Sequence, residues 1–243
     1  MDGVTGQDGR RADAGSIRLG ERDIAGLLLC GEMYGVPYDL LAAALGVSAD
    51  RLRAIVARWR SAGYAQTGRL GPGPAWCWLT RHGMAVTGLR YAATRPSLGR
   101  LAHIRAVTAI RLSLQDSPAY QDGKAWWRSE RRIRKAGGWG TPGGHVPDAE
   151  VTWPETSPAY AGECWAIEAE LTPKPVPRTV GIMSGLLTRT DEAQTARPPR
   201  YDRVIYLCAA PARPVAERAA AVLPGRLVSR LVIRDLPAGA VLA

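Results

Sequence analysis

Residues 164–174 read CWAIEAELTPK, and from Ile167 to Leu171 apolar and acidic side chains alternate. Side chains alternate between the two faces of a β-strand, so a strand over 164–171 carries an apolar face and, on its other face, Glu168 and Glu170. Acidic side chains in the middle of an apolar strand cost free energy unless their charge is compensated. A divalent cation would compensate them, because hard cations take oxygen ligands.

A second acidic strand is expected just before this one. Residues 146–153 read VPDAEVTW, and a strand there places Val146, Asp148 and Glu150 on one face. If the two strands pair with their acidic faces on the same side, as many as four carboxylates converge. The alternative is a solvated polar face on an edge strand, because an acidic cluster is only probabilistic evidence of function.

The composition limits the class of protein and of partner. A chain of 243 residues is long enough for one large domain or two small ones. Its net charge of +10 favours a polyanionic partner such as DNA. The four cysteines are far apart, which argues against a zinc site or disulfides and for buried thiols in a cytoplasmic protein. No segment is apolar enough to span a membrane, and the polar residues 1–19 are expected to be a disordered tail.

The first structured part is expected to contain three helices and a hairpin. Apolar periodicity predicts helices over residues 21–33, 37–45 and 48–61. Ser48 is the expected N-cap of the third helix. Residues 64–69 and 75–79 flank a Gly-Pro-Gly-Pro turn and predict a β-hairpin.

This order of elements resembles a winged helix-turn-helix covering residues 20–92, and AAALGVS at 42–48 looks like its tight turn. The resemblance implies that the third helix enters the major groove of DNA and that the hairpin is the wing. The alternatives are a solvated arginine face on an ordinary three-helix domain and a protein-docking module. The DNA contacts expected in this part are Arg51, Arg53, Arg58, Arg60 and Arg69.

The second part, residues 98–238, is expected to be a mixed α/β domain. Its pattern predicts, in order, a helix, three strands, a helix, a strand, a helix and a strand. The predicted ranges are 101–114, 125–134, 146–153, 164–171, 178–190, 204–209, 214–223 and 227–233. Residues 137–144 and 191–200 are expected to be loops.

That order, with Pro-Asp on the second strand and paired acids on the third, resembles the PD-(D/E)xK nuclease superfamily. Together with the winged helix-turn-helix, it is similar to the replication-relaxation family of actinobacterial plasmids and integrative elements. The matching stretches are HIRAV at 103–107, WRSERR at 127–132, VPDAE at 146–150, AIEAELTPK at 166–174 and YDRVIY at 201–206.

The resemblance implies a metal-dependent phosphodiester site. Asp148 and Glu168 would bind Mg²⁺, with Glu130 as an additional upstream acid, and the metal would activate water and neutralise charge on the phosphate. The chain departs from the family pattern at the lysine, because Glu170 stands at its position and Lys174 follows four residues later. The expected catalytic set is therefore Asp148, Glu168, Glu170 and Lys174.

Further basic and aromatic residues have both a structural and a functional interpretation. Glu130 is expected to pair with a neighbouring arginine more readily than with a metal. His103 is expected to be a core histidine, whereas His145 could face a phosphate. The tryptophans near residue 126 could stack on bases, although anchoring of the core is the commoner role. The DNA contacts expected in this part are Arg128, Arg132 and Arg134.

Three hypotheses of function follow. The first is a DNA-binding protein of a mobile element that cleaves phosphodiesters in plasmid replication, relaxation or transfer. The second is a non-catalytic transcription or replication regulator whose degenerate nuclease-like domain supports a homodimer or binds a partner. The third is a structural assembly module without salt-dependent DNA binding. Contact between Lys174 and the acidic cluster would favour the enzyme, whereas pairing of Glu170 with an arginine would favour the regulator.

Overall fold

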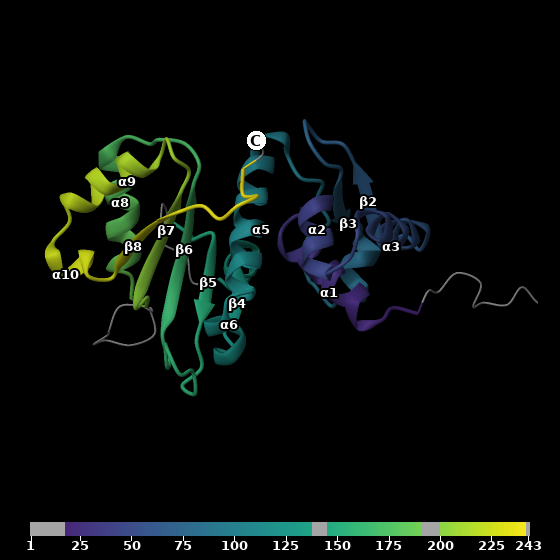
Figure 1. The fold of residues 1–243 in the computed structure, drawn as a ribbon, viewed down its shortest axis with the longest axis horizontal. Helices are drawn as coiled ribbons and strands as arrows, with labels where there is room; N and C mark the ends of the chain where they lie inside the picture. The colour runs from purple at the N-terminus through teal and green to yellow at the C-terminus, as the bar shows by residue number, and fades with distance from the viewer. Residues whose placement is uncertain (1–17, 138–144, 191–199, 242–243) are drawn as a thin grey trace, which may run out of the picture.

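The computed structural model describes residues 18–137, 145–190 and 200–241. It is a mixed α/β protein with a three-stranded and a five-stranded sheet (Figure 1). The tail expected over 1–19 and the loops expected over 137–144 and 191–200 lie almost wholly outside the described residues. No described helix has the length and apolar character needed to cross a membrane.

The N-terminal part folds around the small sheet, whose order is β1-β3-β2 with antiparallel neighbours. The predicted helices and hairpin are confirmed, and Val36–Pro37 also pairs with β3 as a short strand. The elements are α1 (Glu21–Glu32), β1 (Val36–Pro37), α2 (Tyr38–Leu45), α3 (Ala49–Ser61), β2 (Ala65–Gly68), β3 (Trp76–Leu79) and α4 (Arg81–Val86).

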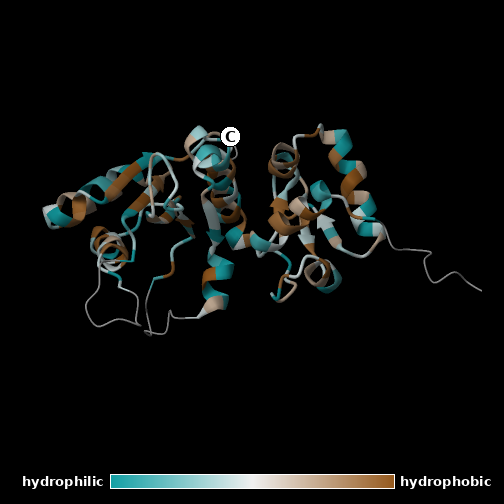
Figure 2. Ribbon diagram, turned by 90° about the horizontal axis from the view of Figure 1, so that it is seen from below, coloured by the Kyte–Doolittle hydropathy of each residue, from teal (hydrophilic) through white to brown (hydrophobic). Residues whose placement is uncertain are grey.

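Helix α3 forms as its sequence predicts. The Ser48 side chain accepts a hydrogen bond from the backbone N–H of Arg51 at 3.3 Å and so satisfies one of the free donors of the first turn. Its apolar residues are buried and its arginines are exposed, an alternation visible along the helix in Figure 2. The buried residues of α3 are Leu52, Ile55, Val56 and Trp59.

The C-terminal part is a five-stranded sheet of order β4-β5-β6-β7-β8 between helices. Strand β5 runs antiparallel to both of its neighbours, β4 and β6, whereas β6, β7 and β8 run parallel to one another. Helix α5 covers one face of the sheet, and α8 and α9 cover the other (Figure 1). The elements are η1 (Leu98–Arg100), α5 (Leu101–Gln115), α6 (Pro118–Gly123), β4 (Trp126–Ser129), α7 (Glu130–Ala136), β5 (Ala149–Thr152), β6 (Cys164–Glu170), α8 (Val176–Leu187), β7 (Arg203–Cys208), α9 (Arg213–Ala221), α10 (Gly225–Val228) and β8 (Leu231–Asp235).

Strand β6 has the two faces that its alternation predicts. Trp165, Ile167 and Ala169 join the hydrophobic core on the α5 side, whereas Glu168 and Glu170 point to the opposite face. The strand is central and both acids are buried, so a solvated face on an edge strand is the wrong interpretation for them.

The strand predicted over 125–134 is wrong in its second half. Strand β4 ends at Ser129, whose hydroxyl accepts a hydrogen bond from the N–H of Arg132 and begins α7. Alternating arginine and glutamate fit either element, and the N-cap decides for the helix. The last strand also begins four residues later than predicted and ends two residues later, because α10 occupies residues 225–228.

Candidate acidic site and nucleic-acid interface

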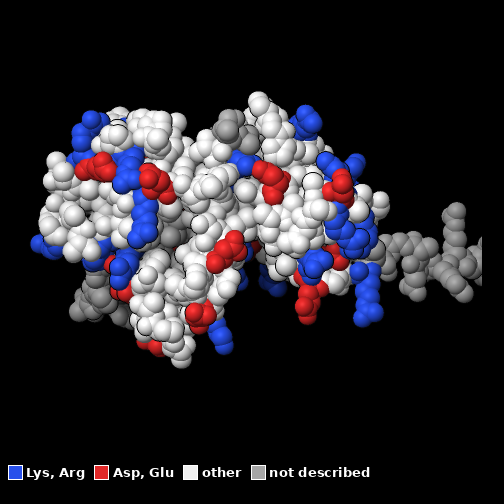
Figure 3. Space-filling model, in the orientation of Figure 1, with Lys and Arg blue, Asp and Glu red and all other residues white. Residues whose placement is uncertain are grey.

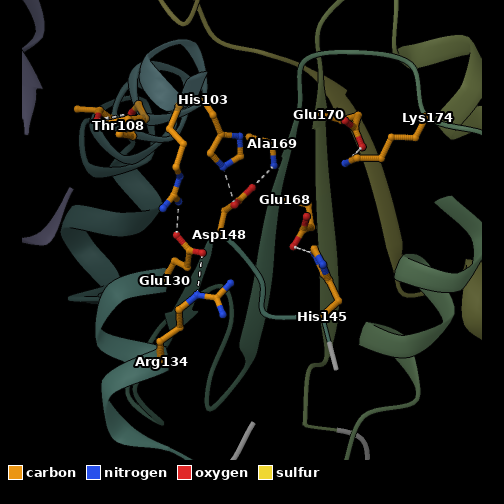
Figure 4. Close-up of polar contacts among 12 residues, drawn as sticks. His103, Thr108, Glu130, Arg134, His145, Asp148, Glu168, Ala169, Glu170 and Lys174 are labelled. Carbon is orange, nitrogen blue, oxygen red and sulfur yellow. Dashed lines mark hydrogen bonds and ion pairs between the residues drawn. The ribbon is translucent and has the colours of Figure 1, made fainter. Parts of the chain in front are cut away.

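Asp148 lies immediately before β5 and is held by two groups (Figure 4). Its Oδ2 accepts a hydrogen bond of 2.8 Å from the backbone N–H of Ala169 on β6. Its Oδ1 lies 2.7 Å from Nε2 of His103, which projects from α5. The carboxylate is therefore fixed between the helix and the central strand.

Glu168 lies in the middle of β6, paired in register with Tyr206 of β7. Its carboxylate is buried, and its Oε1 lies 2.8 Å from Nε2 of His145 (Figure 4). Burial and then the charge of Asp148 raise the pKa of Glu168 to about 7, although the contact with His145 opposes this. The side chain is thus a carboxyl group that can gain or lose a proton near neutral pH.

Both histidines belong to this cluster. Burial alone would lower the pKa of His103 and of His145, but the hydrogen bond and charge of the neighbouring carboxylate raise it in each case. His103 has a hydrogen-bonding partner, as expected, but its ring is partly exposed beside Asp148 and does not lie in the core. No sequence pattern pairs His103 with Asp148, because the two residues are 45 positions apart.

Lys174 lies beyond Pro173 and turns back to the end of β6. Its Nζ donates to Oε2 of Glu170, the residue at the position of the family lysine (Figure 4). The ammonium is close enough to lower the pKa of both Glu168 and His145 electrostatically. Lys174 therefore adds a positive charge to the acidic face.

Glu130 is bound to two arginines. Arg100 donates to one carboxylate oxygen at 2.7 Å and Arg134 to the other at 2.9 Å. This agrees with the expected pairing with an arginine and leaves Glu130 poorly placed as a metal ligand.

Asp148 and Glu168 have the donor chemistry that a hard cation takes. Their carboxylates are close enough for the charge of one to raise the pKa of the other, and a divalent cation would relieve that repulsion. No group of three or more His, Cys, Asp or Glu side chains that could hold a metal occurs among the described residues. Mg²⁺ needs fewer, since it is usually bound by one or two carboxylates together with water and phosphate oxygens.

Glu150 shares this face of the sheet but not the cluster. Arg128 donates to one of its oxygens at 3.0 Å, and Arg200 and the hydroxyl of Tyr201 donate to the other at 2.7 Å each. Three of the four predicted carboxylates, Asp148, Glu168 and Glu170, therefore lie together without Glu150.

The arginines predicted to contact DNA fall into two groups. Those of the N-terminal part are exposed on α3 and at the start of the β2–β3 turn, where Figure 3 shows basic side chains gathered. Arg53 pairs with Asp50, and Arg58 pairs with Asp23 at 2.5 Å. In the second group, Arg128 and Arg134 are paired with glutamates, whereas Arg132 is exposed and lies 4.9 Å from the ring centre of exposed Trp126.

A groove lies between α3 and the hairpin. It is lined by Arg60 and Ser61 of α3, by Gln66 and Thr67 of β2 and by Trp78 of β3.

Comparison of the chain with protein-family models, curated proteins and solved structures finds no match.

Proposed function

We propose that this chain binds DNA with α3 and the β2–β3 hairpin and cleaves a phosphodiester at the acidic face of β6. The proposal rests on one observation above all: Lys174 returns to Glu170 beside Asp148 and the buried Glu168. A site that had lost its catalytic function would have no reason to keep two carboxylates that repel each other, because such a pair destabilises the folded protein. The resemblance to the replication-relaxation family adds a role on a mobile element.

The residues of the site divide the chemistry among them. Asp148 and Glu168 would hold Mg²⁺, which when bound supplies positive charge at the phosphate and lowers the pKa of water. Lys174 has three donors that can orient a water or bind a phosphate oxygen. His103 and His145, whose pKa values are raised, can donate a proton to the leaving oxygen.

The deciding experiment is cleavage of supercoiled plasmid and of branched DNA with Mg²⁺ or Mn²⁺. Wild type is compared with Asp148→Ala and Glu168→Ala, and with Glu155→Ala as a control for loss of an exposed acid. We expect both site variants to lose cleavage and the control to keep it. Cleavage that survives in Asp148→Ala and Glu168→Ala would assign it to another site or to a contaminant.

The regulator is the second candidate, and Glu170 at the lysine position is the observation that favours it. It predicts DNA binding without cleavage in all four proteins. Binding itself is tested by fluorescence anisotropy with Arg51→Ala and Arg60→Ala over a range of salt. We expect affinity to fall with salt and the slope to decrease by about one for each phosphate contact removed.

A further inference from the structure

The stretch WRSERR at 127–132 meets the N-terminal part beside the acidic site. The hydroxyl of Ser129 donates to Oε2 of Glu32, the last residue of α1, at 2.8 Å. The hydroxyl of Tyr91 donates to the other oxygen at 3.4 Å. Glu32 and Ser129 are both buried, so this contact is desolvated and costly to break.

Arg131 makes a second contact with the N-terminal part. Its guanidinium is buried and donates to the carbonyl oxygens of Gly31, at 2.8 Å, and of Ala92. It also lies 4.6 and 4.7 Å from the ring centres of Tyr34 and Tyr91. Within the described residues it forms no ion pair with a carboxylate, so carbonyl groups and aromatic faces of the N-terminal part are what hold this cation.

Tyr34 is held in an unusual backbone conformation. Its φ of 64° lies in the left-handed region, which is unfavourable for a residue other than glycine. The conformation places the ring between Arg131 and Arg100, whose guanidinium lies 4.8 Å from the ring centre. Such conformations persist where surrounding contacts impose them, often at clamps and functional sites.

These contacts continue into the acidic site through Glu130. Arg100, which stacks on Tyr34, forms an ion pair of 2.7 Å with Glu130. The backbone N–H of Glu130 donates to the carbonyl oxygen of Asp148 at 2.9 Å. A notch of about 20 Å³, lined by Tyr34, Arg100, His103 and Asp148 among others, joins the two sets of residues.

We propose that the N-terminal part completes the acidic site, with Glu32, Tyr34 and Arg131 as positioning residues that hold Glu130 and, through it, Asp148. Helix α1, which ends at Glu32, contacts α3 near its first residue. There Asp23 accepts hydrogen bonds from Trp59 at 2.8 Å and from Arg58 at 2.5 Å. Helix α1 thus ties the proposed DNA-binding helix to the site. The positioning role rests on geometry, and only its effect on cleavage rests on the proposed function.

The test compares Tyr34→Ala with the conservative Tyr34→Phe, which keeps the ring, and with Val222→Ala as an exposed control. The chain has three histidines, so ¹H–¹³C spectra of the ring Cε1–H groups report on His103 separately from His82 and His145. At one fixed pH we expect Tyr34→Ala to move the His103 signal and leave His82 unmoved. Tyr34→Phe and Val222→Ala should reproduce wild type.

Cleavage gives the second readout. We expect Tyr34→Ala to lower kcat on the order of tenfold with KM for DNA unchanged, because small misplacements of reacting groups are costly. An unmoved His103 signal in folded Tyr34→Ala overturns the proposal. Wild type that fails to cleave overturns the proposed function instead, and the spectra still decide the positioning role. If Tyr34→Ala does not fold, Arg131→Lys, which keeps the charge but loses the forked donor, takes its place with the same expectations.

Discussion

Glu150 and Glu168 lie on the same face of the sheet, one strand apart, and are equally buried, with 1% and 3% of their surface exposed. Glu150 accepts hydrogen bonds from Arg128, Arg200 and Tyr201. Glu168 has one histidine partner and faces another carboxylate. Burial of an acid therefore says little by itself, and what distinguishes a structural from a functional acid is how fully its charge is compensated.

Removing Glu150 should have the largest effect on stability. Glu150→Ala takes the carboxylate away from the guanidinium of Arg128 and from Arg200, at a site where both are mostly buried. Breaking a buried ion pair from one side costs about 3–5 kcal/mol. Urea denaturation at pH 7 would measure the loss, with Glu155→Ala expected to change stability by less than about 0.5 kcal/mol. A loss of similar size in both variants would contradict the structural role of Glu150.

In contrast to Glu150→Ala, Glu168→Gln should increase the stability of the folded protein at pH 8. The pKa of Glu168 is raised from 4.5 to about 7 by burial and by Asp148, so the folded protein holds this proton more tightly than the unfolded chain. The stability that the proton provides is present below pH 4.5 and is lost as the pH rises through 7.

We therefore expect wild type without metal to lose a few kcal/mol between pH 5 and 8, relative to Glu168→Gln. The two proteins should be alike near pH 4.5 and the variant more stable at pH 8. Thermal unfolding across this range, in buffer with a chelator, would measure the difference. Parallel curves would show that Glu168 is as well compensated as Glu150.

The contrast between these two acids could be predicted from the sequence only in part. Alternation in residues 164–171 predicts which side chains share a face, because strand geometry depends on neighbouring residues alone. The partners of each acid come from distant segments: Arg200 lies 50 residues from Glu150, and His145 lies 23 residues from Glu168. Such pairings depend on the tertiary fold.

Local signals also failed where two of them competed. Residues 125–134 alternate like a strand, yet the Ser129 cap begins a helix, and that turn brings Arg131 to the N-terminal part and Glu130 to Arg100. Ser48, in contrast, caps a helix that apolar periodicity predicts independently, and there the prediction is confirmed. Agreement between cap and periodicity is what made α3 predictable.

Divalent cations should change the stability of the folded protein by a smaller amount than the substitutions of Glu150 and Glu168. A cation bound by Asp148 and Glu168 stabilises the folded state by about 2.7 kcal/mol at a hundred times its dissociation constant. We expect added Mg²⁺ to raise the Tm of wild type more at pH 8 than at pH 5, because the carboxyl of Glu168 is ionised only at the higher pH. Asp148→Asn should abolish the effect, whereas an equal rise in that variant would place the cation elsewhere.

Asp23 provides the opposite case in the N-terminal part. Burial tends to raise its pKa, but hydrogen bonds from Trp59, Gly20 and Arg58 outweigh this and lower it below 3.8. A carboxyl with a lowered pKa gives stability that is present above the unfolded value and is lost as the pH falls through the folded one.

Asp23→Asn should therefore cost about 1–2 kcal/mol at pH 7, the lower part of the range for bonds to a charged group, because Arg58 is partly exposed. The difference from wild type should shrink as the pH falls below 3.8, which is the reverse of the behaviour expected for Glu168. Asp50→Asn, at an exposed pair on the same helix as Arg58, should change nothing measurable. If Asp23→Asn and Glu168→Gln depended on pH in the same direction, compensation by partners would not be what separates these acids, and the assignment of Glu168 to a functional site would lose its physical basis.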